Sequence, residues 1–182
     1  MPKPPKQNPD RPHPRREPRI PLPLSLEHLG RVFDRCADYQ TRTVCLAGAG
    51  ERTLTVCYID GMARTERLND YVLRPLAQDE RLARVPEGEL LEYLRQGALY
   101  AQQVHRRTTL DQVATDLVGG CCALFLQGEG AALTVPVSTE EKRSVGEPEN
   151  EPSLKGARDS FVESVRTNTS LVRRRLRAPE LK

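Results

Sequence analysis

The sequence predicts an α/β fold: a small mixed four-stranded sheet of two hairpins linked by a helical crossover, with helices packed on it. Three observations predict it. Two pairs of strand-like segments each enclose a glycine-containing turn. The chain between the pairs has helical periodicity, and one strand is a nearly continuous apolar run, which is typical of a strand buried on both faces. The fold would be α+β if helices covered only one face.

A short helix and the first hairpin open the folded part. Ser25 is placed to cap the helix, because a Ser side chain accepts hydrogen bonds from the unpaired N–H groups of a first turn. The apolar residues at helical spacing that should face the body are Leu26, Leu29, Val32, Phe33 and Cys36. Residues 41–48 and 53–59 follow as strands, and the glycines between them favour a hairpin.

The second strand ends in Tyr58-Ile59-Asp60-Gly61 (YIDG), and a helix is expected from about Arg64. Enzymes of the α/β class often keep a catalytic carboxylate at such a junction, but no motif ties a His or a second carboxylate to Asp60. We therefore interpret Asp60 as a turn residue beside glycine. The helix should bury three apolar residues on one side, Leu68, Val72 and Leu76.

A further helical stretch begins at Pro86. Its apolar side consists of Leu90, Leu91, Leu94 and Ala98. Residues 99–104 lack a clear pattern and fit either an edge strand or a loop. His105 has no partner at metal-ligand spacing, which predicts an exposed side chain rather than a metal site.

The second hairpin follows one more helix. Thr109 is placed to cap that helix and Gly119-Gly120 to end it. The residues expected to face inward are Leu110, Val113, Ala114 and Leu117. The run CCALFLQ then forms a buried strand, and AALTVPV completes the hairpin after a turn at residues 128–130. The long link from the YIDG strand to CCALFLQ predicts a parallel, right-handed crossover.

Five cysteines, at positions 36, 45, 57, 121 and 122, form no CxxC pair. We interpret them as reduced thiols that pack as small hydrophobes in a cytosolic-type compartment. The adjacent Cys121 and Cys122 suggest a redox pair, but neighbours on a strand point to opposite faces. Core packing is therefore the favoured interpretation.

Charge is distributed unevenly along the chain. Residues 1–23 carry a formal charge of +4, residues 24–154 carry −6 and residues 155–182 carry +5. An acidic body disfavours a nucleic-acid groove across the fold, although a basic end can still touch anionic lipid or another subunit. Residues 1–23 also hold nine of the fifteen prolines, which predicts a disordered basic tail, with polyproline recognition as the alternative.

The rest of the chain, residues 24–182, is expected to form a single lobe. It divides into a body (24–137), an acidic linker (138–152) and a terminal helix (153–177). No run of eighteen apolar residues and no signal-peptide pattern occurs, so this chain is expected to be soluble. It lacks a phosphate-binding glycine motif, GxSxG, HExxH and any Cys/His cluster, which predicts a protein that is not an enzyme, with no catalytic residues, metal or cofactor.

The terminal helix carries the most specific pattern. Taken from about Ala157 with Gly156 as its cap, it places Phe161, Val165, Val172 and Leu176 on one apolar stripe. Asn168 lies on the same stripe, where its amide must find hydrogen-bond partners or lower the stability. The arginines at the carboxyl end complement the helix dipole.

Two stretches of the chain resemble one known family. The first is the ordered, ungapped set Glu147-Pro148, Glu151, Lys155-Gly156, Arg158, Phe161, Glu163, Thr167-Asn168 and Leu171 through Arg175. The second is YIDG with the helix and LRPL after it, more than eighty residues earlier. Both resemble the A subunits of bacterial spore germinant receptors. Ala157 and Ser160 depart from that pattern, which usually has proline and glycine there; the first loosens the helix start and the second favours the helix.

The resemblance implies a place and partners. Such an A subunit joins an amino-terminal soluble region to transmembrane helices in the spore inner membrane, and it assembles with B and C subunits in a receptor that responds to nutrients. This chain is expected to be the first lobe of that region, on an aqueous, core-facing or cytosolic side. Its partners would be the rest of the A subunit and the B and C subunits, together with a nutrient germinant or a second copy as further options.

The resemblance also indicates which residues to test. Binding or interface contacts are expected at Arg158, Phe161, Glu163, Thr167, Asn168, Arg173, Arg174 and Arg175. The helix would then join this lobe to another lobe or subunit, or else it closes this lobe's own core with its arginines in solvent. Two rival functions remain open: binding of a small germinant in a pocket at the strand ends, and binding of anionic lipid or nucleic acid by the arginine-rich end, with nucleic acid the weakest.

Overall fold

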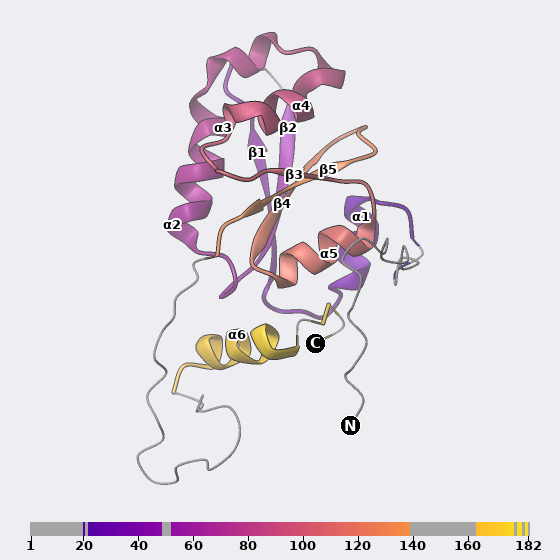
Figure 1. The fold of residues 1–182 in the computed structure, drawn as a ribbon, viewed down its shortest axis with the longest axis vertical. Coiled ribbons are helices and arrows are strands. Elements are labelled where there is room, and N and C mark those ends of the chain that lie inside the picture. The colour runs from indigo at the N-terminus through magenta and orange to yellow at the C-terminus, as the bar shows by residue number, and fades with distance from the viewer. Residues whose placement is uncertain are drawn as a thin grey trace, which may run out of the picture.

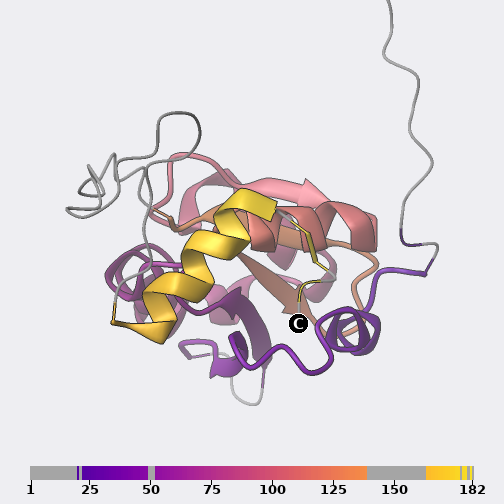
Figure 2. The same ribbon diagram turned by 90° about the horizontal axis from the view of Figure 1, so that it is seen from below.

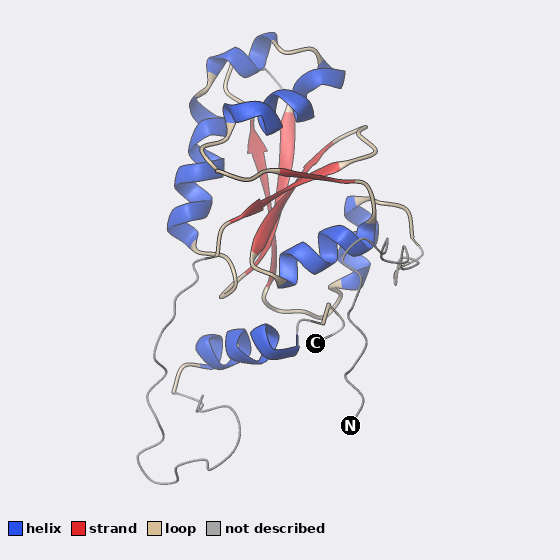
Figure 3. Cartoon of the chain, in the orientation of Figure 1, coloured by secondary structure: helices blue, strands red, loops and turns tan. Residues whose placement is uncertain are grey.

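The structure of this chain is a computed structural model that describes residues 20, 22–48, 52–138, 163–176, 178–179 and 181. Residues 1–19, the linker from residue 139 and the expected contact residues Arg158 and Phe161 lie outside the described residues. In the described part, helices cover both faces of one twisted sheet (Figure 1, Figure 3).

The sheet has five strands in the order β1-β2-β4-β5-β3, each antiparallel to its neighbours. The strands are β1 (Tyr39–Cys45), β2 (Thr53–Ile59), β3 (His105–Arg107), β4 (Cys121–Leu126) and β5 (Ala132–Pro136). The two predicted hairpins, β1–β2 and β4–β5, are confirmed, with Thr43 opposite Thr55 and Ala123 opposite Thr134. They meet where β2 pairs with β4, which places Thr55 opposite Phe125.

Apart from α6, the helices lie in two groups on opposite faces of this sheet (Figure 1). They are α1 (Leu26–Val32), α2 (Thr65–Leu68), α3 (Arg74–Gln78), α4 (Leu90–Tyr93), α5 (Leu110–Val118) and α6 (Val165–Leu176). Wide π-helical turns continue α2 as η1 (Asn69–Leu73) and α4 as η4 (Leu94–Ala98), while η2 (Glu80–Arg84) and η3 (Glu87–Glu89) are tight 3₁₀ turns. The segment from α2 to η4 covers one face, and α1 with α5 covers the other.

Two hydrophobic cores result, because successive side chains of a strand point to opposite faces of the sheet. On one face Leu54, Leu124 and Leu133 pack with the apolar side of the segment from α2 to η4. On the other face Ile59 and Phe125 pack with α1 and α5. Coverage of both faces confirms the α/β class and excludes the α+β alternative. The apolar helix residues predicted to face inward are buried, except Leu26, which is exposed, and Val32, which is half-buried.

Two predicted details of the sheet are wrong. It has five strands rather than four, and the strands joined by the helical crossover, β2 and β4, are antiparallel rather than parallel. Both differences follow from β3, a three-residue edge strand that the loop 99–104 leads into. After β2 the chain crosses to the far edge of the sheet and forms β3, which runs opposite to β2. Helix α5 then leads back to β4, which runs in the same direction as β3 and is therefore antiparallel to β2. Its sequence, HRR, is too short and polar for alternation to identify it.

The predicted serine and threonine caps of α1 and α5 are present, while Gly156 and residues 49–51 of the first hairpin turn lie outside the described residues. Ser25 Oγ accepts a hydrogen bond from the His28 N–H at 3.1 Å, and Thr109 Oγ1 accepts one from Gln112 at 3.4 Å. Asp60 lies in the turn that follows β2, where Gly61 adopts a φ of 80°. His105 is exposed in β3, and all five cysteines are free thiols.

Gly120 provides a test of the close junction between α5 and β4. Its φ is +88°, and a Cβ there would lie 2.6 Å from Ser138 Cβ and 3.2 Å from the Met62 carbonyl oxygen. We expect Gly120→Ala to lower the free energy of unfolding by about 1–3 kcal/mol in urea denaturation, because both the backbone and the contact are strained. Gly130→Ala is the matched control, since a Cβ there meets nothing within 4 Å. Equal losses in both variants would contradict this account.

Candidate functional site

Helix α6 lies across the end of the sheet where β1 begins and β2 ends (Figure 1, Figure 2). It begins at Val165 rather than near Ala157, since Glu163 and Ser164 are not helical. Ser164 acts as the cap: its Oγ accepts from the Thr167 N–H at 3.3 Å and its carbonyl from the Asn168 N–H at 3.1 Å. Serine is a preferred residue at this position, which explains why the helix starts there.

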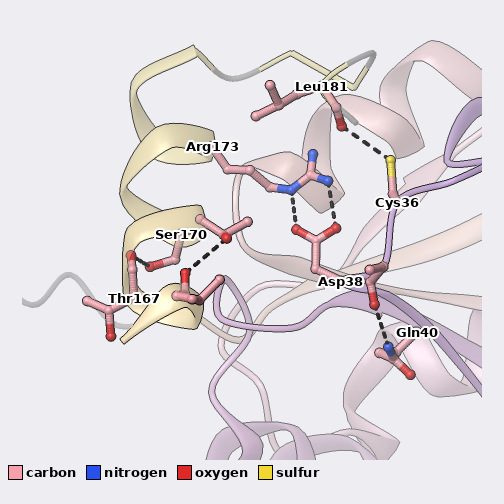
Figure 4. Close-up of polar contacts among 10 residues, drawn as sticks. Cys36, Asp38, Gln40, Thr167, Ser170, Arg173 and Leu181 are labelled. Carbon is pink, nitrogen blue, oxygen red and sulfur yellow. Dashed lines mark hydrogen bonds and ion pairs between the residues drawn. The ribbon is translucent and has the colours of Figure 1, made fainter. Parts of the chain in front are cut away.

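Arg173 fastens α6 to the body of the lobe. Its side chain is only 3% exposed, and its guanidinium faces the carboxylate of Asp38, whose side chain is 16% exposed (Figure 4). Arg173 Nη2 donates to Asp38 Oδ1 at 2.6 Å, and Arg173 Nε donates to the other carboxylate oxygen. Hydrogen bonding to Asp38 is the main cause that raises the pKa of Arg173 above its ordinary value. The two-point contact uses the planar fork of arginine, which lysine lacks.

Asp38 also links α6 to the YIDG strand end. Its backbone carbonyl accepts a hydrogen bond from the Asp60 N–H at 2.7 Å, while its carboxylate holds Arg173. The next residue, Tyr39, pairs with Ile59 as β1 begins. The YIDG strand end and the triple-arginine helix end, which lie far apart in the sequence, are therefore joined through one residue that belongs to neither.

A second contact ties the chain beyond α6 to the body. The Cys36 thiol donates to the Leu181 carbonyl oxygen at 3.2 Å (Figure 4). On α6 itself, Ser170 is buried and donates its hydroxyl to the Thr167 carbonyl at 2.8 Å. The buried face of α6 is thus small and polar, with Arg173 as its anchor.

The predicted apolar stripe of α6 points away from that face. Val165 is 78% exposed, Leu176 is 59% exposed and Val172 is half-buried. Successive helix residues are about 100° apart, so Ser170 and Arg173 lie on a different side of α6 from these residues. The described part of the helix docks through its polar side, and Val165 and Leu176 do not close this lobe's core. Phe161, the first residue of the stripe, lies outside the described residues, so the alternative in which the helix closes the core stays a prediction.

The other predicted contact residues do not gather at this anchor. Glu163, Thr167, Arg174 and Arg175 are exposed, and Asn168 is half-buried. Asn168 therefore has less of its amide to satisfy than a fully buried position on the stripe would require. Whether these residues form an interface remains a prediction.

Sequence reasoning missed Asp38 and Cys36, the two body residues that hold the end of the chain. Asp38 is 135 positions from Arg173, and no spacing rule connects residues so far apart. Its local context, between a helix and a strand, is typical of an ordinary connecting residue. A weak signal was available: Asp38 precedes β1 directly, and a hairpin brings that point beside the YIDG strand end.

The buried ion pair fixes the position of α6 more than it adds to stability. Removing two charges from water costs about as much as their attraction returns, unless every polar atom is satisfied. Arg173 Nη1 is buried without a hydrogen-bond partner among the described residues, so the compensation is incomplete. Removing one partner lowers the stability strongly, because the other charge then stays buried without a counter-charge. The pair therefore specifies one position of α6 on the body.

The Arg173–Asp38 pair attaches α6 to the body and fixes its position. Among the described residues, no group of three or more His, Cys, Asp or Glu side chains is placed to hold a metal ion. In the same part of the chain, no helix combines the length and the apolar character that crossing a membrane requires.

Comparison with known proteins identifies a family. A sequence model described as "Bacillus/Clostridium GerA spore germination protein" matches residues 27–182. The membrane protein YfkQ of Bacillus subtilis is 32% identical over 161 residues, which cover 88% of this chain and 30% of YfkQ. Spore germination protein KA of the same organism is 29% identical over 128 residues, 70% of this chain and 23% of that protein. The chain thus spans less than a third of the length of these curated relatives.

A solved structure of a germination protein has the same fold. It is the N-terminal domain of the A subunit of the Bacillus megaterium spore germinant receptor GerK3, which matches with a TM-score of 0.64 and 20% sequence identity. The match covers 85% of this chain and 54% of that chain. At this identity the likeness concerns the fold alone.

The Arg173–Asp38 anchor can be tested by hydrogen exchange. Arg173→Met leaves the Asp38 carboxylate without its cation, a change that costs about 3 kcal/mol or more for a buried pair. We expect amide exchange in α6 to accelerate at least about tenfold while exchange in β4 is unchanged, because α6 detaches without unfolding the sheet. Arg42→Met, which removes an exposed charge from β1, should leave α6 protected. Unchanged protection of α6 in both variants would contradict the anchor.

Proposed function

The chain belongs to the GerA family of Bacillus/Clostridium spore germination proteins, and from this membership we propose that it is the amino-terminal lobe of a spore germinant receptor A subunit. In this role the lobe contributes to nutrient-triggered germination through receptor assembly and signal transmission. The family match over residues 27–182 supports the germination role, and the structure suggests how the lobe makes contact.

The observation that carries this proposal is the two-sided character of α6. One side is held on the body by Arg173 and Asp38, while Val165 and Leu176 expose apolar surface on another side. Single exposed apolar residues are common on soluble proteins. Two that recur on one face of an anchored helix, with Val172 between them, are better suited to contact another folded part.

Partners and location follow as parts of the same proposal. The exposed stripe of α6 contacts the rest of the A subunit or the B or C subunit, with Arg174 and Arg175 pairing with carboxylates at the rim. The lobe lies on an aqueous side of the spore inner membrane. The relatives extend well beyond the matched region, which supports an arrangement in which this lobe is one part of a larger receptor.

A second candidate function is direct binding of a small germinant. The observation that favours it is a hollow beside the end of β5, lined by Arg67, Tyr71, Tyr100 and Pro136 among others. Binding of anionic lipid or nucleic acid by the arginine-rich end has less support, since Arg173 is buried and paired with Asp38. That leaves fewer cations for phosphate groups.

The stripe can be tested in spores that carry the complete A subunit with Val165→Gln and Leu176→Gln together. We expect delayed or lost nutrient germination, because the exposed apolar contact is removed. The free energy of unfolding of the isolated chain should change by less than about 0.5 kcal/mol, since both side chains are exposed. Leu26→Gln on α1 is the matched control, an exposed apolar residue on another surface. Normal germination of the double variant would argue against the docking role.

The second candidate function is tested with a nutrient panel on the purified chain. A germinant that binds only the folded state raises the free energy of unfolding by RT ln(1 + [L]/Kd), so its thermal stabilisation should increase with concentration as this relation requires. Calorimetry supplies the affinity. If none of the nutrients that germinate the source spores stabilises the chain saturably, direct binding by this lobe is excluded.

A further inference from the structure

We propose that the hollow beside the end of β5 is a binding site for a small organic carboxylate, with Arg67 as its anion-binding group. The hollow has a volume of about 560 Å³ and is lined by Arg67, Tyr71, Tyr100, Ala101, Gln102, Gln103 and Pro136. Its walls come from α2 and η1 on one side and from the segment before β3, which crosses the face of the sheet (Figure 1). This volume lies within the range of about 300–1,000 Å³ found for small-molecule sites.

Arg67 supplies a positive charge that none of the described carboxylates neutralises. Its Nη1 donates to the Ser138 carbonyl oxygen at 2.7 Å, which fixes the half-buried guanidinium at the wall of the hollow. No carboxylate pairs with Arg67 among the described residues, and no acidic side chain is among those that line the hollow. A guanidinium has five N–H donors, so most of them remain for an anionic acceptor.

The two tyrosines give the hollow flat, amphipathic walls. The Tyr100 N–H donates to the Tyr71 carbonyl oxygen at 3.1 Å, which ties the segment before β3 to η1. Pro75, four positions after Tyr71, has no N–H and cannot supply the i+4 hydrogen bond to this carbonyl. Tyr100 is 67% exposed, unusual for so large a ring in a chain with only eight Phe and Tyr residues. Rings placed in this way can stack on a flat ligand.

The chemistry of the lining selects the ligand class. A guanidinium with no carboxylate partner among the described residues favours an anion, and its planar fork matches the two oxygens of a carboxylate. The amides of Gln102 and Gln103 and the phenols add donors without adding negative charge. Inorganic phosphate could use Arg67 but would leave the aromatic walls without a contact. We therefore commit to a carboxylate with a flat or apolar body.

This inference deepens the second candidate function and rests on it, because it names the site and the ligand class for small-molecule binding by this lobe. The hollow lies beside the carboxyl end of β5 and is lined by the segment that precedes β3. This position agrees with the sequence-based alternative of a germinant pocket at the strand ends. It is separate from the Arg173–Asp38 anchor, since the two share no residue.

The test uses the purified 182-residue chain in a buffer without carboxylate or phosphate, with sodium benzoate, benzamide and inorganic phosphate as probes in titration calorimetry. Benzoate and benzamide share shape but differ in charge. We expect saturable binding of benzoate and at least about tenfold weaker binding of benzamide and phosphate, as loss of a charge-assisted hydrogen bond predicts. Arg67→Met should weaken benzoate binding at least about tenfold, and Arg67→Lys should weaken it less, because it retains the charge.

Arg74→Met is the matched control. It removes the same charge from α3 nearby, where Arg74 pairs with Asp70 at 3.0 Å and does not line the hollow, so benzoate binding should be unchanged. Equal binding of benzoate and benzamide, equal binding by the wild type and Arg67→Met, or preference for phosphate would each overturn the proposal. A nutrient that stabilises the chain regardless of Arg67→Met leaves the second candidate function intact and removes this site. If no probe and no nutrient binds the chain, both the second candidate function and the site in the hollow are excluded.

Discussion

Strand β4 must be covered on both faces, and this constraint decides where most other elements lie. Cys122 and Leu124 face one core, and Ala123 and Phe125 face the other. Because β4 lies between β2 and β5, its residues 123–126 pair with β2 and its residues 121–125 pair with β5, so most of its backbone groups bond to neighbouring strands rather than to water. The helical segment after β2 therefore occupies one face, while α1 and α5 occupy the other. A single helical layer would leave one apolar face exposed.

The end of the chain is held in a different way. The two cores contain no residue of α6, which contacts the body through the buried Arg173–Asp38 ion pair. Apolar packing is non-directional, whereas the Arg173–Asp38 contact accepts one geometry. A helix held by such a pair has a defined position and keeps its apolar stripe for another contact. This combination suits an element that joins one folded part to the next.

Local backbone chemistry shapes the hollow beside β5. Pro75 has no N–H for an i+4 bond to the Tyr71 carbonyl, and that carbonyl accepts a hydrogen bond from the Tyr100 N–H. Gly97, with a φ of 132°, lies inside the last turn of η4 and lets the chain turn toward that contact. The same proline belongs to the LRPL stretch that resembles the germinant receptor pattern. One residue thus affects both the helix and the wall of a candidate ligand site.

The sequence by itself determined the local elements and the family. Apolar periodicity placed the helices and the long strands, and Ser25 and Thr109 marked two helix starts, because these signals act over a few residues. The ordered motif residues indicated the family, which the match over residues 27–182 bears out. Edge strand β3 was not predictable, since three polar residues carry no periodicity and depend on pairing with β5. Only the tertiary structure decided the direction of β4, the orientation of α6 and the pairing of Arg173 with Asp38. Each depends on contacts between residues far apart in the chain, and no local pattern encodes the distance between them.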